Sequence, residues 1–282
     1  MTATVIDGRA IAAELREDLK ARVAALRARG VAPHLAVAVL GDDPAARSYV
    51  RAIERAAAAV DAVCTVHRLP DTAGEDELGA LLDALGADDG VHGVIVQTPL
   101  PAGLDIATIG ARIRVEKDVD GLNPTSAGRL ALGLPSYPPA TAAAVMEAVH
   151  RAGVGLRGAR AVVIGRSAVV GKPVALLLLR EDATVTLCHS RTVDLPAVAR
   201  EADLLVAAVG RVRMVGAGYV RPGAVVIDVG INDVDGKTVG DVDYEPVAEI
   251  AGAITPVPGG IGPLTNVMLL RNMIQAAEAT IG

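Results

Sequence analysis

The sequence predicts an α/β protein with two domains, each built on a parallel sheet. The chain has 282 residues, which is enough for two domains of ordinary size with separate cores. Hydrophobic residues make up 51% and charged residues 21%, a balance typical of folded globular proteins. Short apolar runs alternate with amphipathic helical segments, and strand–helix–strand units of this length form parallel sheets.

The first half of the chain begins with a helix. Apolar side chains from Ile11 to Leu26 recur at spacings of three and four residues, which is the pattern of an amphipathic helix. Farther on, Asp43 followed by Pro44 supplies the N-cap and first-turn pair of a second helix. The expected elements are a helix closed at residues 29–30, a strand at 35–40, a helix at 44–60, a strand at 64–69, a helix at 75–85 and a strand at 91–96.

A proline-rich stretch at residues 134–139 marks a domain boundary, because a polar stretch precedes it and a new α/β pattern follows. The elements expected after it are a helix at 141–152, strands at 161–164, 184–188, 204–209 and 224–229, and a last helix from 263 to about 279. We expect this last helix to pack on the first domain. Residues 1–138 with 263–282 then form one domain, and 139–262 are inserted as the other.

Charge and hydropathy narrow the classes of partner. The formal net charge is −6 and the basic residues are scattered, which argues against nucleic acid as a main partner. No apolar run approaches the roughly 20 residues that span a bilayer, and the first residues lack a signal-peptide pattern. The two cysteines and five histidines show no metal-ligand spacing. We therefore expect a cytoplasmic protein without a metal site.

The strand at 161–164 leads into a candidate phosphate-binding turn. The turn runs from Gly165 to Gly171 with the sequence GRSAVVG, and a helix follows it. The N–H groups and dipole at such a helix start attract a pyrophosphate. A strand–helix turn without a ligand is the alternative interpretation, since the usual GxGxxG pattern is absent.

The next strand favours NADP over NAD. NAD-binding proteins usually place Asp or Glu at its end to hold the ribose hydroxyls. Here the strand ends in the residues 188–192, CHSRT, without an acid. Arg166 and Arg191 could both face a 2′-phosphate, although Arg191 could also be an ordinary solvated surface charge.

Six motifs occur along the chain. They are GDDPAARSYV at 41–50, VQTPLP at 96–101, KDVDG at 117–121, VIGRSAVVGKP at 163–173, CHSRT at 188–192 and PVPGGIGPLT at 256–265. Together they resemble the bifunctional methylenetetrahydrofolate dehydrogenase/cyclohydrolase (FolD) family, over nearly the whole chain, in order and with compatible spacing. The resemblance implies a three-layer α/β catalytic domain that binds folate, an inserted Rossmann-type NADP-binding domain, a cleft between them and a homodimer joined through the dinucleotide domains.

The resemblance also implies roles for site residues. Asp120 would accept parallel hydrogen bonds from the amino and ring N–H groups of the pterin, as a carboxylate can; without the resemblance it could simply cap a loop. Tyr49 would lie along the folate, and Gln97, at a strand end, would reach the reacting centre. The implied cofactor-binding residues are Gly165, Arg166, Ser167, Gly171, Ser190, Arg191 and Ile231. The implied substrate loop comprises Pro258, Gly259, Gly260, Gly262 and Thr265, whose glycines let backbone approach ligands closely.

One departure from the family pattern concerns catalysis. The family has Tyr-Val-x-x-Lys, which places Lys on the same helix face as Tyr. In this chain Ile53 occupies the lysine position. Arg51 and Arg55 are rotated from that face by roughly 200° and 240° at about 100° per residue. An arginine also cannot give up its proton near neutral pH. Lesser departures are Ala140, Ala142 and Ser126, which stand where the family commonly has Cys, Pro and Asn.

The missing lysine affects the two family reactions differently. Oxidation of methylenetetrahydrofolate removes a hydride, so no proton moves and the product is cationic. Hydrolysis of the methenyl product requires deprotonation of water, and loss of a positioned proton-transfer group typically costs about 10²–10⁴-fold. We therefore predict a dehydrogenase with weak or absent cyclohydrolase activity. The alternatives are a fully bifunctional enzyme that forms formyltetrahydrofolate, a non-catalytic folate- and NADP-binding paralogue, and an enzyme acting on a modified folate.

Overall fold

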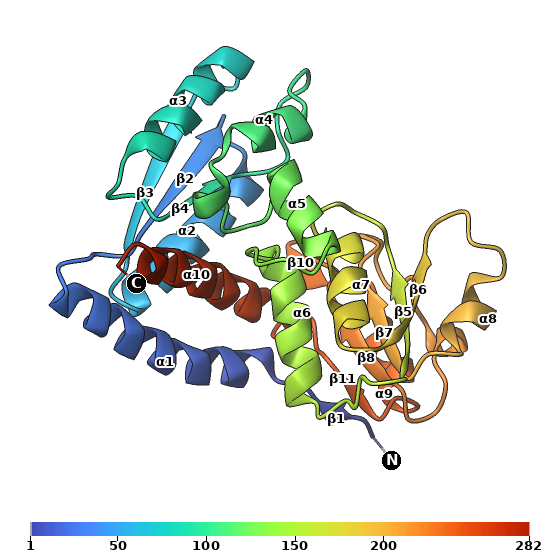
Figure 1. Cartoon of the computed structure of the whole chain (residues 1–282). Helices are drawn as coiled ribbons and strands as arrows, with labels where there is room; N and C mark the ends of the chain where they lie inside the picture. Colours follow the sequence, from blue (N-terminus) through green and yellow to red (C-terminus); the bar gives the residue numbers. More distant parts are fainter. Residues whose placement is uncertain (1, 282) are drawn as a thin grey trace. The chain divides into compact units, whose positions relative to one another are not determined.

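A computed structural model describes residues 2–281, and the chain divides into two compact units (Figure 1). The three-strand unit consists of Ala13–Ala140 and the chain from Asn266 onward. The six-strand unit consists of Thr141–Thr265 and the residues up to Ala12. The breaks lie two or three residues beyond the predicted boundaries at 138/139 and 262/263.

The start of the chain differs from the prediction, which placed it in the folate-binding domain. Strand β1 (Thr4–Val5) pairs in parallel with β11 (Ala253–Ile254), so the first residues join the six-strand unit. Neither strand has more than two residues, which is too short for a periodic signal in the sequence.

The three-strand unit has a parallel sheet in the order β3-β2-β4. Its strands are β2 (His34–Leu40), β3 (Val63–Leu69) and β4 (Gly93–Val96). The helices that lie wholly or mostly in this unit are α1 (Gly8–Ala28), α2 (Pro44–Ala59), α3 (Glu75–Ala87), α4 (Ile106–Arg112), the 3₁₀ turn η1 (Val115–Lys117), α5 (Pro124–Ala131) and the last helix α10 (Ile261–Ala279).

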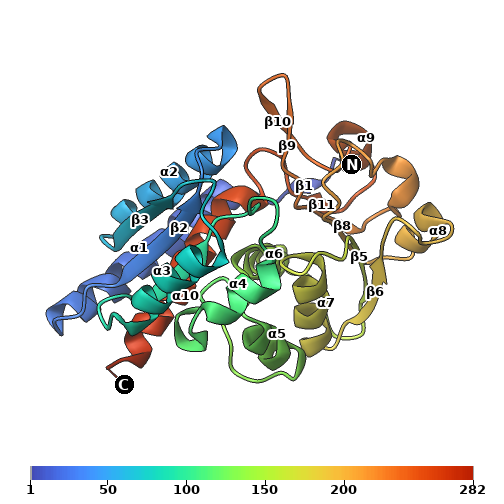
Figure 2. The ribbon, with the colours of Figure 1, turned by 90° about the horizontal axis from the view of Figure 1, so that it is seen from above.

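Long-range contacts hold α10 in the three-strand unit, as predicted for the last helix. Arg22 of α1 donates two hydrogen bonds to the Glu278 carboxylate of α10, at 2.9 and 2.8 Å. The two helices lie side by side (Figures 1 and 2). In the core of this unit, Ala36 and Val94 of the sheet pack with Leu78 and Leu82 of α3. Aliphatic side chains fill this core, as the lack of Phe and Trp requires.

The six-strand unit has an all-parallel sheet in the order β1-β11-β8-β7-β5-β6. The strands not yet given are β5 (Arg160–Ile164), β6 (Thr184–Cys188), β7 (Leu204–Ala207) and β8 (Val225–Asp228), with an antiparallel hairpin of β9 (Asn232–Val234) and β10 (Lys237–Val239). The helices are α6 (Ala140–Arg151), α7 (Gly171–Arg180), α8 (Leu195–Ala199), the 3₁₀ turn η2 (Ala217–Tyr219) and α9 (Tyr244–Ala248).

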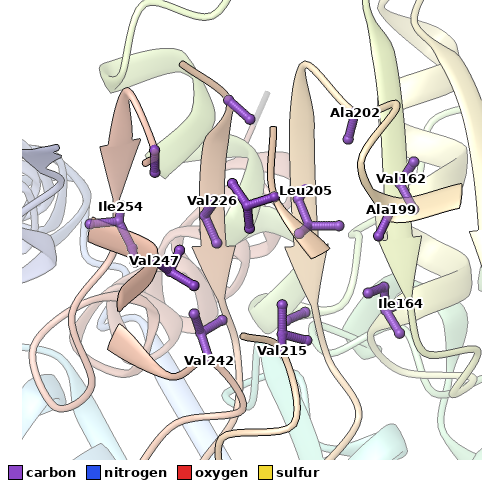
Figure 3. Close-up of a cluster of buried hydrophobic side chains, with 14 of the residues drawn as sticks. Val162, Ile164, Ala199, Ala202, Leu205, Val215, Val226, Val242, Val247 and Ile254 are labelled. Carbon is purple, nitrogen blue, oxygen red and sulfur yellow. The ribbon is translucent and has the colours of Figure 1, made fainter. Parts of the chain in front are cut away.

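One apolar cluster of the six-strand unit lies on one face of its sheet. Neighbouring strands contribute Ile164, Leu205, Val226 and Ile254, all almost fully buried (Figure 3). The inner strands β5, β7 and β8 are buried along nearly their whole length, so they are nearly continuous apolar runs. This is why the sequence shows these strands clearly.

No helix in the described part of the chain is long and apolar enough to cross a membrane. The expected cytoplasmic location stays a prediction.

Candidate active site

Helix α2 positions Tyr49 in the three-strand unit. The helix starts directly after the loop that follows β2, and the Asp43 carboxylate accepts the N–H of Ala46 at 2.9 Å to cap it. Tyr49 is half-buried, and burial, with a smaller effect of the Asp120 charge, raises the pKa of its phenol. The hydroxyl therefore stays protonated at neutral pH and acts as a hydrogen-bond donor.

The two carboxylates of the KDVDG motif have different tasks. Asp118 is completely buried, and its two oxygens accept the N–H groups of Leu122 at 2.8 Å and Asn123 at 2.9 Å. It therefore folds the loop. Asp118 also forms a parallel bridge with Val94 of β4, so Asp120, two residues on, lies toward the end of that strand.

Asp120 has an environment that suits ligand binding. One of its oxygens accepts the N–H of Ala140 at 2.9 Å. Burial raises the pKa of the carboxyl to about 6, although the bond from Ala140 lowers it and the Asp118 charge raises it slightly. Because Ala140 acts through its backbone, the change from the family's Cys at this position leaves the bond intact.

Asn272 of α10 fixes the loop that carries Asp120. Its side-chain amide donates to the carbonyl of Val119 at 2.8 Å and to that of Pro138 at 2.9 Å. These bonds join the segments on either side of the Asp120–Ala140 contact. Asn272 lies in none of the six motifs and was not expected at the site; its one signal in the sequence is a polar side chain within an apolar helical stretch.

Gln97 directly follows β4. Its backbone N–H bonds to the Ala38 carbonyl at 2.9 Å and so continues the strand pairing. Its side-chain amide donates to the Thr98 carbonyl at 2.7 Å. Gln97 therefore lies at the strand end where the sequence analysis placed it, and its contact with a reacting centre stays a prediction.

Ile53 lies one helical turn after Tyr49 on α2. It is only 1% exposed, and Arg51 and Arg55 are both exposed. The two arginines are thus on the solvent side of α2, as the helix geometry predicts. The position of the family lysine is apolar and closed to water in this chain.

The turn after β5 requires glycine at both ends. A Cβ on Gly165 would lie 2.0 Å from the Ala208 carbonyl oxygen, and one on Gly171 would lie 2.0 Å from the Gly165 carbonyl oxygen. Ser167 closes the turn, since its Oγ accepts the N–H groups of Val170 at 3.2 Å and Gly171 at 3.3 Å. Helix α7 starts at Gly171, so its N-terminus faces the turn, as in phosphate-binding elements.

The loop after β6 and this turn both follow the carboxyl ends of their strands, so they lie at the same end of the sheet. Strands β5 and β6 are neighbours, and the Gly165 N–H bonds to the Cys188 carbonyl at 2.9 Å. The side chains of Arg166, Ser190 and Arg191 are exposed. The structure therefore brings the two predicted arginines onto adjacent loops with polar side chains between them, which fits an anionic ligand.

The glycine-rich loop before α10 borders a cavity of about 140 Å³ within the six-strand unit. Gly259 has a φ of 114°, and a Cβ on Gly260 would lie 2.6 Å from the Pro256 carbonyl oxygen. Thr265 is buried and donates its hydroxyl to the Ile261 carbonyl at 3.2 Å. The predicted loop and cofactor residues that line the cavity are Ile231, Pro258, Gly259, Gly260 and Gly262.

Arg9 and Asp228 line the same cavity and were missed by the sequence analysis. Arg9 has no motif around it that indicates a ligand. Asp228 ends strand β8, and a carboxylate at the carboxyl end of a parallel strand is a recognisable signal.

Among residues 2–281, no group of three or more His, Cys, Asp or Glu side chains is arranged to hold a metal ion.

Family profiles match both parts of the chain. The catalytic domain of tetrahydrofolate dehydrogenase/cyclohydrolase matches residues 6–120, and the NAD(P)-binding domain of the same enzymes matches residues 139–281. The bifunctional protein FolD of Parafrankia sp. is 63% identical over 273 residues, which are 97% of this chain and 98% of that protein. The bifunctional protein FolD of Chloroflexus aurantiacus is 50% identical over 284 residues, 100% of both chains.

Solved structures agree with these matches. The bifunctional enzyme FolD of Campylobacter jejuni has a TM-score of 0.97 at 41% identity, with 99% of each chain covered. The Trypanosoma brucei enzyme, solved in complex with an NADP cofactor and inhibitor, has a TM-score of 0.95 at 37% identity, over 100% of this chain and 99% of that one. The resemblance found in the motifs is thus confirmed along the whole length, and the chain belongs to the tetrahydrofolate dehydrogenase/cyclohydrolase family.

Proposed function

We propose that this chain is an NADP-dependent methylenetetrahydrofolate dehydrogenase with little or no cyclohydrolase activity. The family membership and the retained Tyr49, Gln97 and Asp120 support the dehydrogenase. The observation that carries the second half of the proposal is Ile53, a buried apolar side chain where the family pattern has lysine.

The residues for folate binding fit the dehydrogenase reaction. The Asp120 oxygen that does not bond to Ala140 can accept hydrogen bonds from the pterin N–H groups, and the Tyr49 hydroxyl can donate. Bound NADP supplies the hydride acceptor. The ring left behind is cationic, so an uncharged Ile53 introduces no repulsion against it. The chain needs only to orient the ring and exclude water.

The same residues are poorly suited to activating water. Tyr49 keeps its proton at neutral pH, and Arg51 and Arg55 are on the solvent side of α2. Ile53 can neither take nor give a proton. Without a positioned acceptor, attack of water on the methenyl carbon is expected to be slower by about 10²–10⁴-fold.

Two absorbance assays test the proposal on the purified protein. One follows formation of NADPH from methylenetetrahydrofolate, and the other follows loss of methenyltetrahydrofolate. The proposal expects robust NADPH formation and methenyl loss close to the buffer rate. Lack of NADPH formation refutes the dehydrogenase activity and favours the non-catalytic paralogue. Fast loss of methenyltetrahydrofolate refutes the proposed lack of cyclohydrolase activity.

A fully bifunctional enzyme is the second candidate, because Asp120 offers another proton acceptor. Its carboxyl has a pKa of about 6, which is suited to general-base catalysis near neutral pH. The bacterial relatives that carry the name bifunctional are consistent with it. In that case the methenyl hydrolysis rate would rise with pH through about 6.

The cofactor preference rests on charge. Arg166 and Arg191 are exposed cations on adjacent loops, and residues 188–192 contain no acid that would repel a 2′-phosphate. Ser167 and Ser190 add hydroxyl donors at the same sheet edge. These side chains favour NADP over NAD by direct recognition of the additional phosphate.

A homodimer is also proposed, and the exposed edge of the six-stranded sheet supports it. Strand β6 is the last in the sheet order, and Leu187 on it is 37% exposed. Leu179 of α7, which packs on β6, is 59% exposed. An edge strand that pairs on one side only and has exposed apolar neighbours is a suitable surface for a second copy. Light scattering should give twice the chain mass, and Leu187→Lys should shift the protein toward the monomer.

A further inference from the structure

Two buried carboxylates near the carboxyl ends of the strands of the six-stranded sheet have no part in the chemistry proposed above. Asp228 ends β8, and Asp241 follows the β9–β10 hairpin. Both are buried, at 3% and 0% exposure. A buried carboxylate costs free energy unless hydrogen bonds satisfy it, so its partners indicate what it does.

Asp241 binds the loop that follows β7. Its Oδ2 accepts the N–H groups of Val209 at 2.6 Å and Gly210 at 3.0 Å. Its Oδ1 accepts the N–H of Arg211 at 2.8 Å and the side-chain amide of Asn232 at 3.0 Å. One carboxylate thus holds three consecutive backbone N–H groups and the side chain of Asn232, the first residue of β9.

Asp228 binds the segments on either side of the hairpin. Its Oδ1 accepts the N–H groups of Gly230 at 2.9 Å and Asp241 at 3.0 Å, and its Oδ2 accepts that of Val242 at 2.9 Å. Its own N–H donates to the Thr255 hydroxyl at 2.7 Å. Burial raises the pKa of Asp228 to about 6, and these N–H groups oppose that rise.

Two glycines make this close approach possible. A Cβ on Gly230 would lie 2.4 Å from the Asp241 carboxyl carbon, and a Cβ on Gly240 would lie 1.9 Å from a carboxylate oxygen of Asp228. Val242, the residue after Asp241, buries its side chain in the core of the unit (Figure 3). This packing fixes the segment that carries Asp241.

The loops held in this way border the predicted cofactor site. A Cβ on Gly165 would lie 2.0 Å from the Ala208 oxygen, so the phosphate-binding turn touches the start of the Val209–Arg211 loop. Ile231, a predicted cofactor contact, is 71% exposed although both of its neighbours, Gly230 and Asn232, are bonded to the carboxylates. Ile231 also lines the cavity beside the glycine-rich loop, together with Gly259 and Gly260.

We infer that Asp228 and Asp241 are positioning residues for dinucleotide binding, which fix the Val209–Arg211 loop and Ile231 beside the phosphate-binding turn. The inference rests on the proposed use of NADP. If the loss of these bonds reduces the ligand-ready population of the loops to about one tenth, the apparent Kd for the dinucleotide rises about 10-fold.

Asp203, whose side chain is 35% exposed, offers a control carboxylate next to the same sheet. It precedes β7, at the amino ends of the strands and so away from the predicted cofactor site. Its carboxylate accepts the Arg160 N–H at 2.8 Å and pairs with Arg221. Asp241→Asn replaces an acceptor oxygen with an NH₂ group that faces N–H donors. Asp203→Asn makes the same replacement at a carboxylate that does not bind the Val209–Arg211 loop. Asn232→Ala is a milder variant, since it removes one donor to Asp241 and leaves both carboxylates.

The experiment measures NADPH binding by its fluorescence, the Tm, and amide hydrogen exchange at residues 209–211. We expect Asp241→Asn to raise the Kd for NADPH about 10-fold and to speed exchange at 209–211, and Asn232→Ala to do both to a smaller extent. Asp203→Asn should lower the Tm without either change. Equal Kd values in Asn232→Ala, Asp203→Asn and the natural protein would overturn the inference. Since no folate is present, missing dehydrogenase activity does not affect the result; a natural protein that fails to bind NADPH overturns the inference together with the proposed cofactor.

Discussion

The raised pKa of Asp120 predicts how folate binding depends on pH. The proposed bonds to the pterin require the ionised carboxylate, because a protonated carboxyl loses acceptor capacity. With a pKa of about 6, the ionised fraction is about 0.9 at pH 7 and about 0.09 at pH 5. The affinity for tetrahydrofolate should therefore fall about 10-fold between these pH values. An Asp with its ordinary value of 3.8 would stay ionised throughout.

Binding of tetrahydrofolate, measured anaerobically by calorimetry between pH 5 and pH 8, tests this prediction. Asp120→Asn is the control, because it retains the shape of the side chain and does not titrate. The ratio of the natural to the variant affinity cancels any protonation of the ligand itself. A ratio that stays constant across this pH range would refute the role given to the Asp120 carboxylate.

The same pKa has the opposite effect on the stability of the free protein. The folded Asp120 carboxyl binds its proton more tightly than the unfolded one, so its contribution to stability is fully present below 3.8 and is lost as the pH rises through about 6. Bound folate should reverse this pH dependence of stability, because it requires the ionised carboxylate. Low pH is therefore expected to weaken folate binding, while protonation of Asp120 does not destabilise the fold.

Three further predictions concern other parts of the chain. Arg191→Gln should raise the KM for NADP about 10-fold, equal to about 1.4 kcal/mol, and leave the KM for NAD nearly unchanged; equal effects on both cofactors would contradict 2′-phosphate recognition. Gly8→Ala should destabilise the protein by about 1–3 kcal/mol in urea unfolding, because its Cβ would lie 1.8 Å from the Gly260 oxygen; an unchanged midpoint would refute that contact. His92 accepts the His34 N–H at 3.3 Å, and burial lowers its pKa from 6.5, so its contribution to stability is present above about 6.5 and lost as the pH falls; His92→Asn should flatten the unfolding free energy across that range.

The main elements were predictable because their signals are local. The Asp43-Pro44 pair indicated the start of α2 to the residue, and the strand expected at 184–188 has the bounds of β6. The last helix was expected from 263 and begins at Ile261. By contrast, the β9–β10 hairpin and helices α4 and α5 were missed, because segments of three to eight residues show too little periodicity.

Site residues were predictable where a motif contains them and not where a fold contact defines them. The KDVDG motif indicated Asp120, but only the structure shows that Asp118 folds the loop and that Ala140 bonds to Asp120. Asp228 and Asp241 are 13 residues apart, and the hairpin that brings them together was not expected. Such pairs depend on tertiary packing, which no local pattern reports.

The central claim is that Ile53 separates the two family activities, and methenyltetrahydrofolate hydrolysis by the natural protein, Ile53→Lys and Ile53→Met tests it most directly. Met matches the length of Lys without a charge, so it controls for repacking at this buried position. Burial of an ammonium group costs several kcal/mol and lowers the pKa of the lysine, so the Tm of each variant is measured as well. The account predicts hydrolysis near the buffer rate in the natural protein and Ile53→Met, a gain in Ile53→Lys, and NADPH formation in all three. Fast hydrolysis by the natural protein would contradict it and assign the proton transfer to another residue, with Asp120 as the first to examine.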